Sequence, residues 1–169
     1  ISAIIPLRLT GEKQETLRRL ARVVAQLPEE MIAIVVDDSP DMTSRNAVAH
    51  TLGRFANTRH VISYETMNHV FSIGPLRDLG AEAAPEGRVL FHDVDFTAPP
   101  ELYRALLHYV ARPEVDGDPT NTLCIPVFFL SRLGTYAYLT APRPTLRRLL
   151  VGSRVQNRLW VDRLVKGSS

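Results

Sequence analysis

Every residue from Met31 to Val36 is apolar, and the acids Asp37 and Asp38 follow this stretch directly. A strand with one face in water alternates apolar and polar residues, whereas a strand buried on both faces is apolar throughout. Parallel sheets that are covered by helices on both sides contain strands of this second kind. The stretch therefore predicts a parallel α/β sheet with acidic groups where the strand ends.

Strand-like and helix-like segments alternate on both sides of this stretch. The predicted strands cover residues 2–8, 31–36, 60–64, 89–93 and 122–130, and the predicted helices cover residues 12–27, 43–55, 75–84 and 101–110. In the first of these helices, Leu20, Val24 and Leu27 recur at the spacing of one helical face. This alternation is typical of an α/β domain with a mainly parallel sheet, flanking helices and right-handed crossovers.

The length of 169 residues suits one domain with a sizeable core. We expect residues 1–130 to form its α/β core and residues 131–169 to form a helical extension. In that extension, residues 145–165 carry leucines and arginines at loose helical spacing. Residues 65–74 and 113–119 are polar or rich in turn-forming residues, so they are predicted to be connecting loops.

The charge of the chain argues against a general nucleic-acid-binding surface. The 20 Lys and Arg residues and 18 Asp and Glu residues give a formal net charge of +2. A local excess of arginine lies between Arg143 and Lys166, and it has two interpretations. The first is a solvated helix face, and the second is a surface that touches anionic lipid or a phosphorylated acceptor. We therefore expect no nucleic-acid partner and leave peripheral membrane association open.

Cysteine usage and hydropathy indicate the compartment. The single cysteine, Cys124, excludes an intrachain disulfide, and its apolar neighbours favour a buried, inert thiol. No apolar run reaches the length of about 18–20 residues that a membrane span needs. The sequence also lacks a signal-peptide pattern. These features predict a cytoplasmic protein, or one at the inner face of the membrane.

A second acidic group ends the strand at residues 89–93, which we predict to be buried because Val89, Leu90 and Phe91 are apolar. Asp93 and Asp95 are separated by one residue, so in an extended chain they would project to one side about 7 Å apart. Two carboxylates this close repel each other unless a cation lies beside them. Mg²⁺ and Mn²⁺ prefer carboxylate oxygen and bind together with substrate phosphates. The alternative is that both acids are solvated and cap the next helix.

Polar groups follow three of the predicted strands. Because ligands of parallel α/β sheets bind beyond the carboxyl ends of the strands, we expect these groups to converge on one crevice. They are Arg8, Asp37 with Asp38, and Asp93 with Asp95. His92, the in-strand neighbour of Asp93, should face the opposite side, so we interpret it as a packing residue rather than a ligand.

Four segments of the chain form a recognisable series. They are Ile4-Ile-Pro6, Ile34-Val-Val-Asp-Asp-Ser39, Phe71-Ser-Ile-Gly-Pro-Leu-Arg-Asp-Leu-Gly-Ala81 and Val89-Leu-Phe-His-Asp-Val-Asp95. In order and spacing they resemble the inverting glycosyltransferases of family 2, particularly the bacterial polysaccharide branch, and the similarity covers about residues 1–130. It implies a GT-A, Rossmann-like nucleotide-diphospho-sugar transferase fold. It also implies a nucleotide-sugar donor, a saccharide or glycolipid acceptor, and Mn²⁺ or Mg²⁺ as cofactor.

The resemblance assigns a nucleotide-binding role to residues after the first two strands. Asp38 matches the acid that accepts the imide N–H of uracil, which suits a carboxylate because it is a pure acceptor when ionised. The backbone at Pro6, Leu7 and Arg8 matches the wall of the base pocket. Asp37 shares the nucleotide-binding assignment. The alternative for the two aspartates is a helix cap at the βα turn, with one residue in each role.

The resemblance also assigns roles to residues nearer the phosphates. Arg77 matches the arginine of the family's Arg-Asn-x-Gly pattern, although Asp78 replaces the asparagine. It would support the nucleotide or hold the acidic loop, and the alternative is a surface arginine paired with Asp78 or Glu82. Asp93 and Asp95 match the family's DxD motif. In that match Asp95 ligates the metal that bridges two phosphates, and Asp93 binds the ribose or a metal-bound water.

The function indicated is metal-dependent inverting transfer of a sugar, from a UDP-linked donor to a polysaccharide or glycolipid. An inverting transfer needs a general base, and the acidic run that supplies it in the family is not present, so we expect an incomplete acceptor-binding half. Two alternatives are a non-catalytic nucleotide-sugar-binding or scaffolding module and a sugar-phosphate nucleotidyltransferase. Residues 7–11 match the phosphate loop of nucleotidyltransferases poorly, which disfavours the second alternative.

Overall fold

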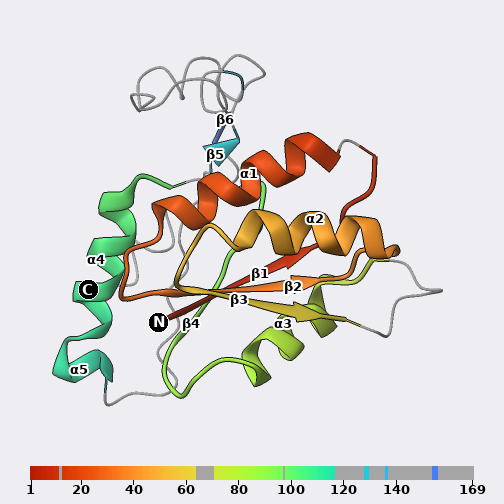
Figure 1. The fold of residues 1–169 in the computed structure, drawn as a ribbon. Coiled ribbons are helices and arrows are strands. Elements are labelled where there is room, and N and C mark those ends of the chain that lie inside the picture. The colour runs from red at the N-terminus through yellow and green to blue at the C-terminus, as the bar shows by residue number, and fades with distance from the viewer. Residues whose placement is uncertain are drawn as a thin grey trace. The chain divides into compact units, whose positions relative to one another are not determined.

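The structure is a computed structural model, drawn as a ribbon in Figure 1. It describes residues 1–11, 13–63, 71–96 and 98–116, together with Phe128, Phe129, Tyr136, Arg154 and Val155. The chain divides into two compact units, Ile1–Pro119 and Thr120–Ser169. All the candidate site residues lie in the first unit.

The first unit alternates strands and helices. Its strands are β1 (Ser2–Leu7), β2 (Ile32–Asp37), β3 (Thr58–Ile62) and β4 (Val89–Phe91). Its helices are α1 (Lys13–Gln26), α2 (Met42–Leu52), α3 (Ile73–Glu82), α4 (Pro100–Val110) and the short α5 (Pro113–Asp116). This order confirms the predicted α/β class. None of the described helices has the length and apolar character needed to cross a membrane.

β1 is paired on both sides in the sheet of the first unit. The described strands of this sheet are parallel and lie in the order β3-β2-β1-β4. Ser2 pairs with Ile32 of β2 and with Val89 of β4. Every residue of β1 is buried, as are the residues from Ala33 to Asp37 in β2. The continuous apolar run in β2 thus lies in an inner strand, as predicted.

Helices cover both faces of this sheet, with α1 and α2 on one face and α3 on the other (Figure 1). Odd-numbered residues of β1 and β2 pack with α1 and α2 in a core that contains Ile5, Leu7, Leu9, Ala33, Val35, Leu20, Val23, Val24, Val48 and Leu52. Even-numbered residues pack with α3 in a core that contains Ile4, Ile34, Val36 and Leu76. The division follows from strand geometry, because successive side chains point to opposite faces.

The direction of strand addition reverses next to β1. The chain passes from β1 to β2 to β3 on one side and then crosses back to β4 on the other side. Right-handed crossovers of this kind place α3 on the face opposite to α1 and α2. In open parallel sheets, ligands bind at the carboxyl ends of the strands where the order reverses. The topology therefore points to the ends of β1 and β4, near Arg8 and Asp93.

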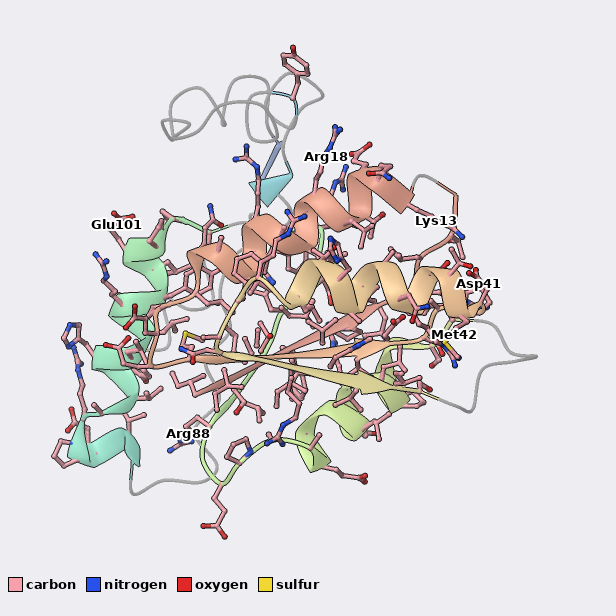
Figure 2. The ribbon with its side chains drawn as sticks, in the orientation of Figure 1. Lys13, Arg18, Asp41, Met42, Arg88 and Glu101 are labelled. Atoms are coloured by element: carbon pink, nitrogen blue, oxygen red, sulfur yellow. The ribbon has the colours of Figure 1, made fainter. Side chains whose placement is uncertain are left out.

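The N-terminal ends of α1 and α2 are joined by polar contacts. The carboxylate of Asp41, the N-cap of α2, accepts the backbone N–H of Ser44 at 2.8 Å. Hydrogen bonds from Ser44 lower the pKa of the Asp41 carboxyl. Nζ of Lys13 lies 3.3 Å from Oδ2 of Asp41, and Figure 2 labels both residues. The contact connects the two helices that share one face of the sheet.

The second unit differs in part from the sequence predictions. Its described strands β5 (Phe128–Phe129) and β6 (Arg154–Val155) pair with each other in antiparallel fashion. The predicted strand at residues 122–130 is therefore confirmed at Phe128–Phe129, whereas the helical extension predicted for residues 131–169 contains a strand at Arg154–Val155. Cys124 and most of the arginine-rich segment lie outside the described residues.

β4 is shorter and more exposed than the sequence predicts. It ends at Phe91, two residues before the predicted end at Asp93. Among the described strands, β4 pairs with β1 alone, and the relative exposures of Val89 and Phe91 are 40% and 47%. The prediction of a buried strand is therefore wrong for β4, because β4 is the outer strand of the described sheet.

Gly80 allows α3 to approach the sheet closely. A Cβ at this position would lie 2.3 Å from Cγ2 of Ile4 and 3.0 Å from Cγ2 of Val36, both in buried strands. Alanine would therefore force α3 away from the sheet. We expect Gly80→Ala to lower the free energy of unfolding by about 1–3 kcal/mol, measured by urea unfolding with circular dichroism.

Gly74→Ala is the matched control. Gly74 also lies in α3, but a Cβ there would have no atom within 4 Å. Because alanine is the better helix former, this variant is expected to lose no stability. Equal losses in the two variants would contradict the packing role of Gly80.

Candidate functional site

Asp37 is the last residue of β2 and is fully buried. Its Oδ1 accepts the backbone N–H of Ser39 at 2.9 Å, and its Oδ2 lies 3.0 Å from Nε2 of His60 in β3. Burial alone would raise the pKa of this carboxyl, but the hydrogen bonds from His60 and Ser39 outweigh burial, and the pKa lies below its usual value. Both oxygens of Asp37 therefore hold the end of β2 in place.

Asp38 is equally buried, but its carboxylate lacks such partners. Neither oxygen accepts a hydrogen bond from any described residue. Nη1 of Arg8 lies 3.8 Å from Oδ2, which is an ion-pair distance longer than a hydrogen bond. Side-chain alternation directs the two adjacent aspartates to opposite sides of the sheet, which accounts for their different surroundings. The helix-cap alternative is wrong for both, because Asp41 caps α2.

The backbone after β1 is fixed against the turn that carries the two aspartates. The N–H of Asp38 donates to the carbonyl of Leu7 at 2.8 Å. The N–H of Leu9 donates to Oγ of the buried Ser39 at 3.0 Å, a contact that the sequence did not predict. These bonds place the residues assigned to the base-pocket wall beside the aspartates, and those residues are Pro6, Leu7 and Arg8.

Asp93 and Asp95 lie in a turn rather than in a strand. Pairing with β1 stops after the N–H of His92 donates to the carbonyl of Ile4 at 2.9 Å. The N–H of Phe96 then donates to the carbonyl of Asp93 at 3.0 Å and closes the turn. The prediction that both acids project to one side of an extended chain is therefore wrong, because no described strand holds this segment extended.

Arg77 in α3 contacts the first acid of the turn. Its Nη2 donates to Oδ1 of Asp93 at 3.1 Å. Its guanidinium carbon lies 5.4 Å from the centroid of the Phe91 ring, within the range of a cation–π contact. In the described part of the chain, Arg77 forms no ion pair with Asp78 or Glu82. Of the contacts predicted for Arg77, the structure thus shows the one that holds the acidic turn.

Arg19 in α1 contacts the second acid. Its Nη1 donates to Oδ1 of Asp95 at 2.6 Å, and its Nη2 pairs with Glu15 one helical turn earlier. Burial alone would lower the pKa of Arg19, but the contacts with Asp95 and Glu15 outweigh it and the pKa is raised. Sequence reasoning missed Arg19, because a Glu-Arg pair at this spacing is typical of any exposed helix. The turn is therefore held by one arginine from each face of the sheet.

His92 connects the start of the turn to helix α4. Its Nδ1 lies 2.9 Å from the carbonyl oxygen of Asp93, and its Nε2 lies 2.7 Å from the hydroxyl of Tyr103 in α4. A carbonyl can only accept, so Nδ1 carries the proton and Nε2 accepts from the tyrosine. Desolvation lowers the pKa of His92, which favours the neutral ring. The prediction that His92 is a packing residue is confirmed by its burial.

The acidic turn supplies oxygen ligands of the kind that Mn²⁺ and Mg²⁺ bind. No group of three His, Cys, Asp or Glu side chains suited to a metal occurs among the residues that the structure describes. Such a group is not required where substrate phosphates complete the shell around one or two carboxylates. The side chain of Asp95 is 67% exposed, so it is accessible to an ion. The turn therefore fits a divalent cation that binds together with a diphosphate.

Comparison with known proteins adds to this geometry. The family described as glycosyltransferase like family 2 matches residues 2–161. The chain belongs to this family. A comparison with curated proteins found no match.

The chain is also similar to solved structures, one of which reaches a TM-score of 0.50 and shows the fold. The crystal structure of S. aureus TarS 1-349 has a TM-score of 0.50 and 22% sequence identity, and the match covers 64% of this chain and 31% of that chain. A second crystal structure, of S. aureus TarS, has a TM-score of 0.48 and 23% identity, and the match covers 64% of this chain and 19% of that chain. The family-2 member described here therefore has the GT-A fold, and it matches less than a third of the length of TarS 1-349.

The two adjacent aspartates should differ in their contribution to stability. Asp37→Asn weakens charge-assisted hydrogen bonds with His60 and Ser39, so we expect it to lower the free energy of unfolding by about 1–3 kcal/mol. Asp38→Asn removes a buried charge that receives no hydrogen bond and has only the 3.8 Å contact with Arg8, so it should cost less stability than Asp37→Asn. Urea unfolding of both variants measures the difference, and equal losses would contradict it.

Protonation of His92 should destabilise the folded protein. Its pKa is lowered from 6.5, so the unfolded chain binds this proton first as the pH falls. The stability linked to neutral His92 is present above pH 6.5 and is lost as the pH falls from there through the folded pKa. The stability linked to ionised Asp37 is lost only at lower pH, because the pKa of Asp37 lies below 3.8 and this stability disappears as the pH falls through it.

The double variant His92→Phe, Tyr103→Phe tests this dependence. It removes both partners of the buried hydrogen bond and leaves no unpartnered hydroxyl. Its free energy of unfolding should fall less steeply than that of the wild type between about pH 6.5 and pH 5. Parallel pH profiles for the two proteins would show that His92 does not titrate in this range.

Proposed function

We propose that this chain binds a UDP-linked sugar donor for metal-dependent, inverting transfer of the sugar to a polysaccharide or glycolipid acceptor. The observation that carries the proposal is the carboxylate of Asp38, which is buried at the end of β2 and accepts no hydrogen bond from a described residue. Membership of the family and the GT-A fold support a nucleotide sugar as the donor class. Asp38 follows β2, the neighbour of β1, where the strand order reverses, and ligands of parallel sheets bind at such a reversal.

Uracil has the chemistry that Asp38 lacks in the protein alone. A buried acceptor without a donor costs about 1–3 kcal/mol, and more when it is charged. The imide N–H of uracil would donate to this carboxylate and remove that cost. The ring nitrogen of cytosine at the same position carries no hydrogen, so the site should favour uridine over cytidine nucleotides.

The acidic turn would hold the diphosphate end of the donor. Asp95, with Asp93, would hold Mn²⁺ or Mg²⁺ through carboxylate oxygens, and Arg77 beside Asp93 would support the phosphates. When bound, the cation supplies Lewis-acid stabilisation of the departing nucleoside diphosphate. The residues named here bind the donor, and none of them is assigned as the base that an inverting transfer needs for the acceptor hydroxyl.

Calorimetric titration of UDP tests the donor site. The wild type is expected to bind UDP in the presence of Mn²⁺, and EDTA should weaken this binding by at least about tenfold. Asp95→Ala should show the same loss in Mn²⁺ and no further loss in EDTA. Asp38→Asn should weaken UDP binding by about tenfold, because the neutral amide oxygen is a weaker acceptor for the imide N–H than the carboxylate is.

CDP is the matched ligand control, because it differs from UDP at the base and carries the same diphosphate. It should bind the wild type more weakly than UDP does, and the two should bind Asp38→Asn alike. Glu101→Gln, which alters an exposed acid of α4, is the matched protein control and should leave UDP binding unchanged (Figure 2). Absence of UDP binding by the folded protein under every condition would overturn the proposal. Binding without turnover of any UDP-sugar would favour a non-catalytic binding module.

A further inference from the structure

Arg19 in α1 contacts Asp95 of the acidic turn, although no sequence motif connects the two residues. The two residues are 76 positions apart, and Nη1 of Arg19 donates to Oδ1 of Asp95 at 2.6 Å. The Arg19 side chain is 27% exposed, whereas that of Asp95 is 67% exposed. Exposed ion pairs contribute little to stability, so the contact matters chiefly for where it places the carboxylate.

Each acid of the turn gives one oxygen to an arginine. Asp93 uses Oδ1 for Arg77 at 3.1 Å, and Asp95 uses Oδ1 for Arg19 at 2.6 Å. The structure shows no hydrogen bond from a described residue to Oδ2 of Asp95. Because a carboxylate offers about four lone-pair sites, an oxygen held by arginine leaves the other oxygen able to bind a cation. The arginine contact therefore orients Asp95 and leaves it able to act as a ligand.

Glu15 reduces the unfavourable effect of an arginine beside a cation site. A guanidinium without a counter-ion would attract the carboxylate and also repel the metal. Arg19 is paired with Glu15 as well as with Asp95, so its positive charge is shared between two acids. Pairwise contacts thus connect Glu15 to Arg19 and Arg19 to Asp95, from α1 to the turn.

We propose that Arg19 is a positioning residue for the metal ligand Asp95, and that Glu15 in turn holds Arg19. This inference rests on the proposed function, because it takes Asp95 as a ligand of the donor-bound cation. Groups that hydrogen-bond to metal ligands fix the orientation of those ligands, and their loss typically weakens metal binding by about 10- to 100-fold. Helix α1 thereby contributes to the site through a side chain that itself touches neither metal nor donor.

Titration of Mn²⁺ into the UDP-saturated protein tests the inference. The matched control is Arg18→Gln, because Arg18 is exposed on the same helix and points away from the sheet (Figure 2). We expect Arg19→Gln to weaken Mn²⁺ binding by about tenfold, Arg19→Lys to recover part of the loss, and Arg18→Gln to remain within about twofold of the wild type. Mn²⁺ binding by Arg19→Gln that equals or exceeds that of Arg18→Gln would overturn the positioning role.

A second measurement needs no metal. The N–H of Phe96 closes the turn on the carbonyl of Asp93, so its hydrogen exchange reports the order of the turn. In EDTA, this amide should exchange at least about threefold faster in Arg19→Gln than in Arg18→Gln. The amide of Ile34 in the inner strand β2 should exchange equally in both, which shows that both variants are folded. Equal exchange at Phe96 in the two variants would overturn the inference.

The two measurements separate a failure of this inference from a failure of the proposed function. If the wild type binds no Mn²⁺ in the presence of UDP, the metal-dependent donor site is wrong and Asp95 is not a ligand. If the wild type binds Mn²⁺ and Arg19→Gln behaves like Arg18→Gln, the donor site stands and the role of Arg19 is wrong.

Discussion

The hydrogen bonding of β1 on both sides is the constraint on which the candidate site depends. Its register fixes β2 on one side and β4 on the other, and all its residues are buried. The segments that carry Arg8, Asp38 and Asp93 therefore leave the sheet next to one another. A slip of one residue would turn every side chain of β1 to the opposite face and bury the wrong set. Burial of apolar surface, at about 25 cal/mol per Å², opposes such a slip and so maintains the site as well as the fold.

The sequence was most informative where apolar patterning and burial coincide. The continuous run at residues 31–36 identified the inner strand β2, and the helical spacing of Leu20 and Val24 identified α1, because burial produces both patterns. It was least informative at β4, where Val89 and Phe91 are apolar and yet exposed. Apolar residues also occur at the surface, so their pattern does not show how many neighbours a strand has. The extended conformation expected for Asp93 and Asp95 was wrong because pairing with β1 ends at His92 and the N–H of Phe96 closes a turn on the carbonyl of Asp93.

In the candidate site, the sequence identified the acids but not their partners. Asp37 and Asp38 are adjacent and identical in type, and only the structure shows that His60 and Ser39 engage one of them. An aspartate whose oxygens receive no hydrogen bond lowers the stability of the unliganded protein. Groups that bind a ligand often have this effect. The role of Arg19 was not predictable, because its contact with Asp95 joins a helix to a turn 76 positions away in the chain. A motif describes residues along the chain, whereas an ion pair between layers depends on how the layers pack.

The attachment of the acidic turn to three helices affects how the protein opens locally. Arg19 connects the turn to α1, Arg77 connects it to α3 on the other face, and His92 connects its start to Tyr103 of α4. Proteins open in cooperative units, and an isolated surface turn belongs to the units that open at the lowest free energy. Here the turn can open fully only when contacts with both helical layers break together. Its full opening therefore costs more free energy than that of a surface turn with no such contacts, so the two carboxylates are held in place more firmly than those of an unattached loop.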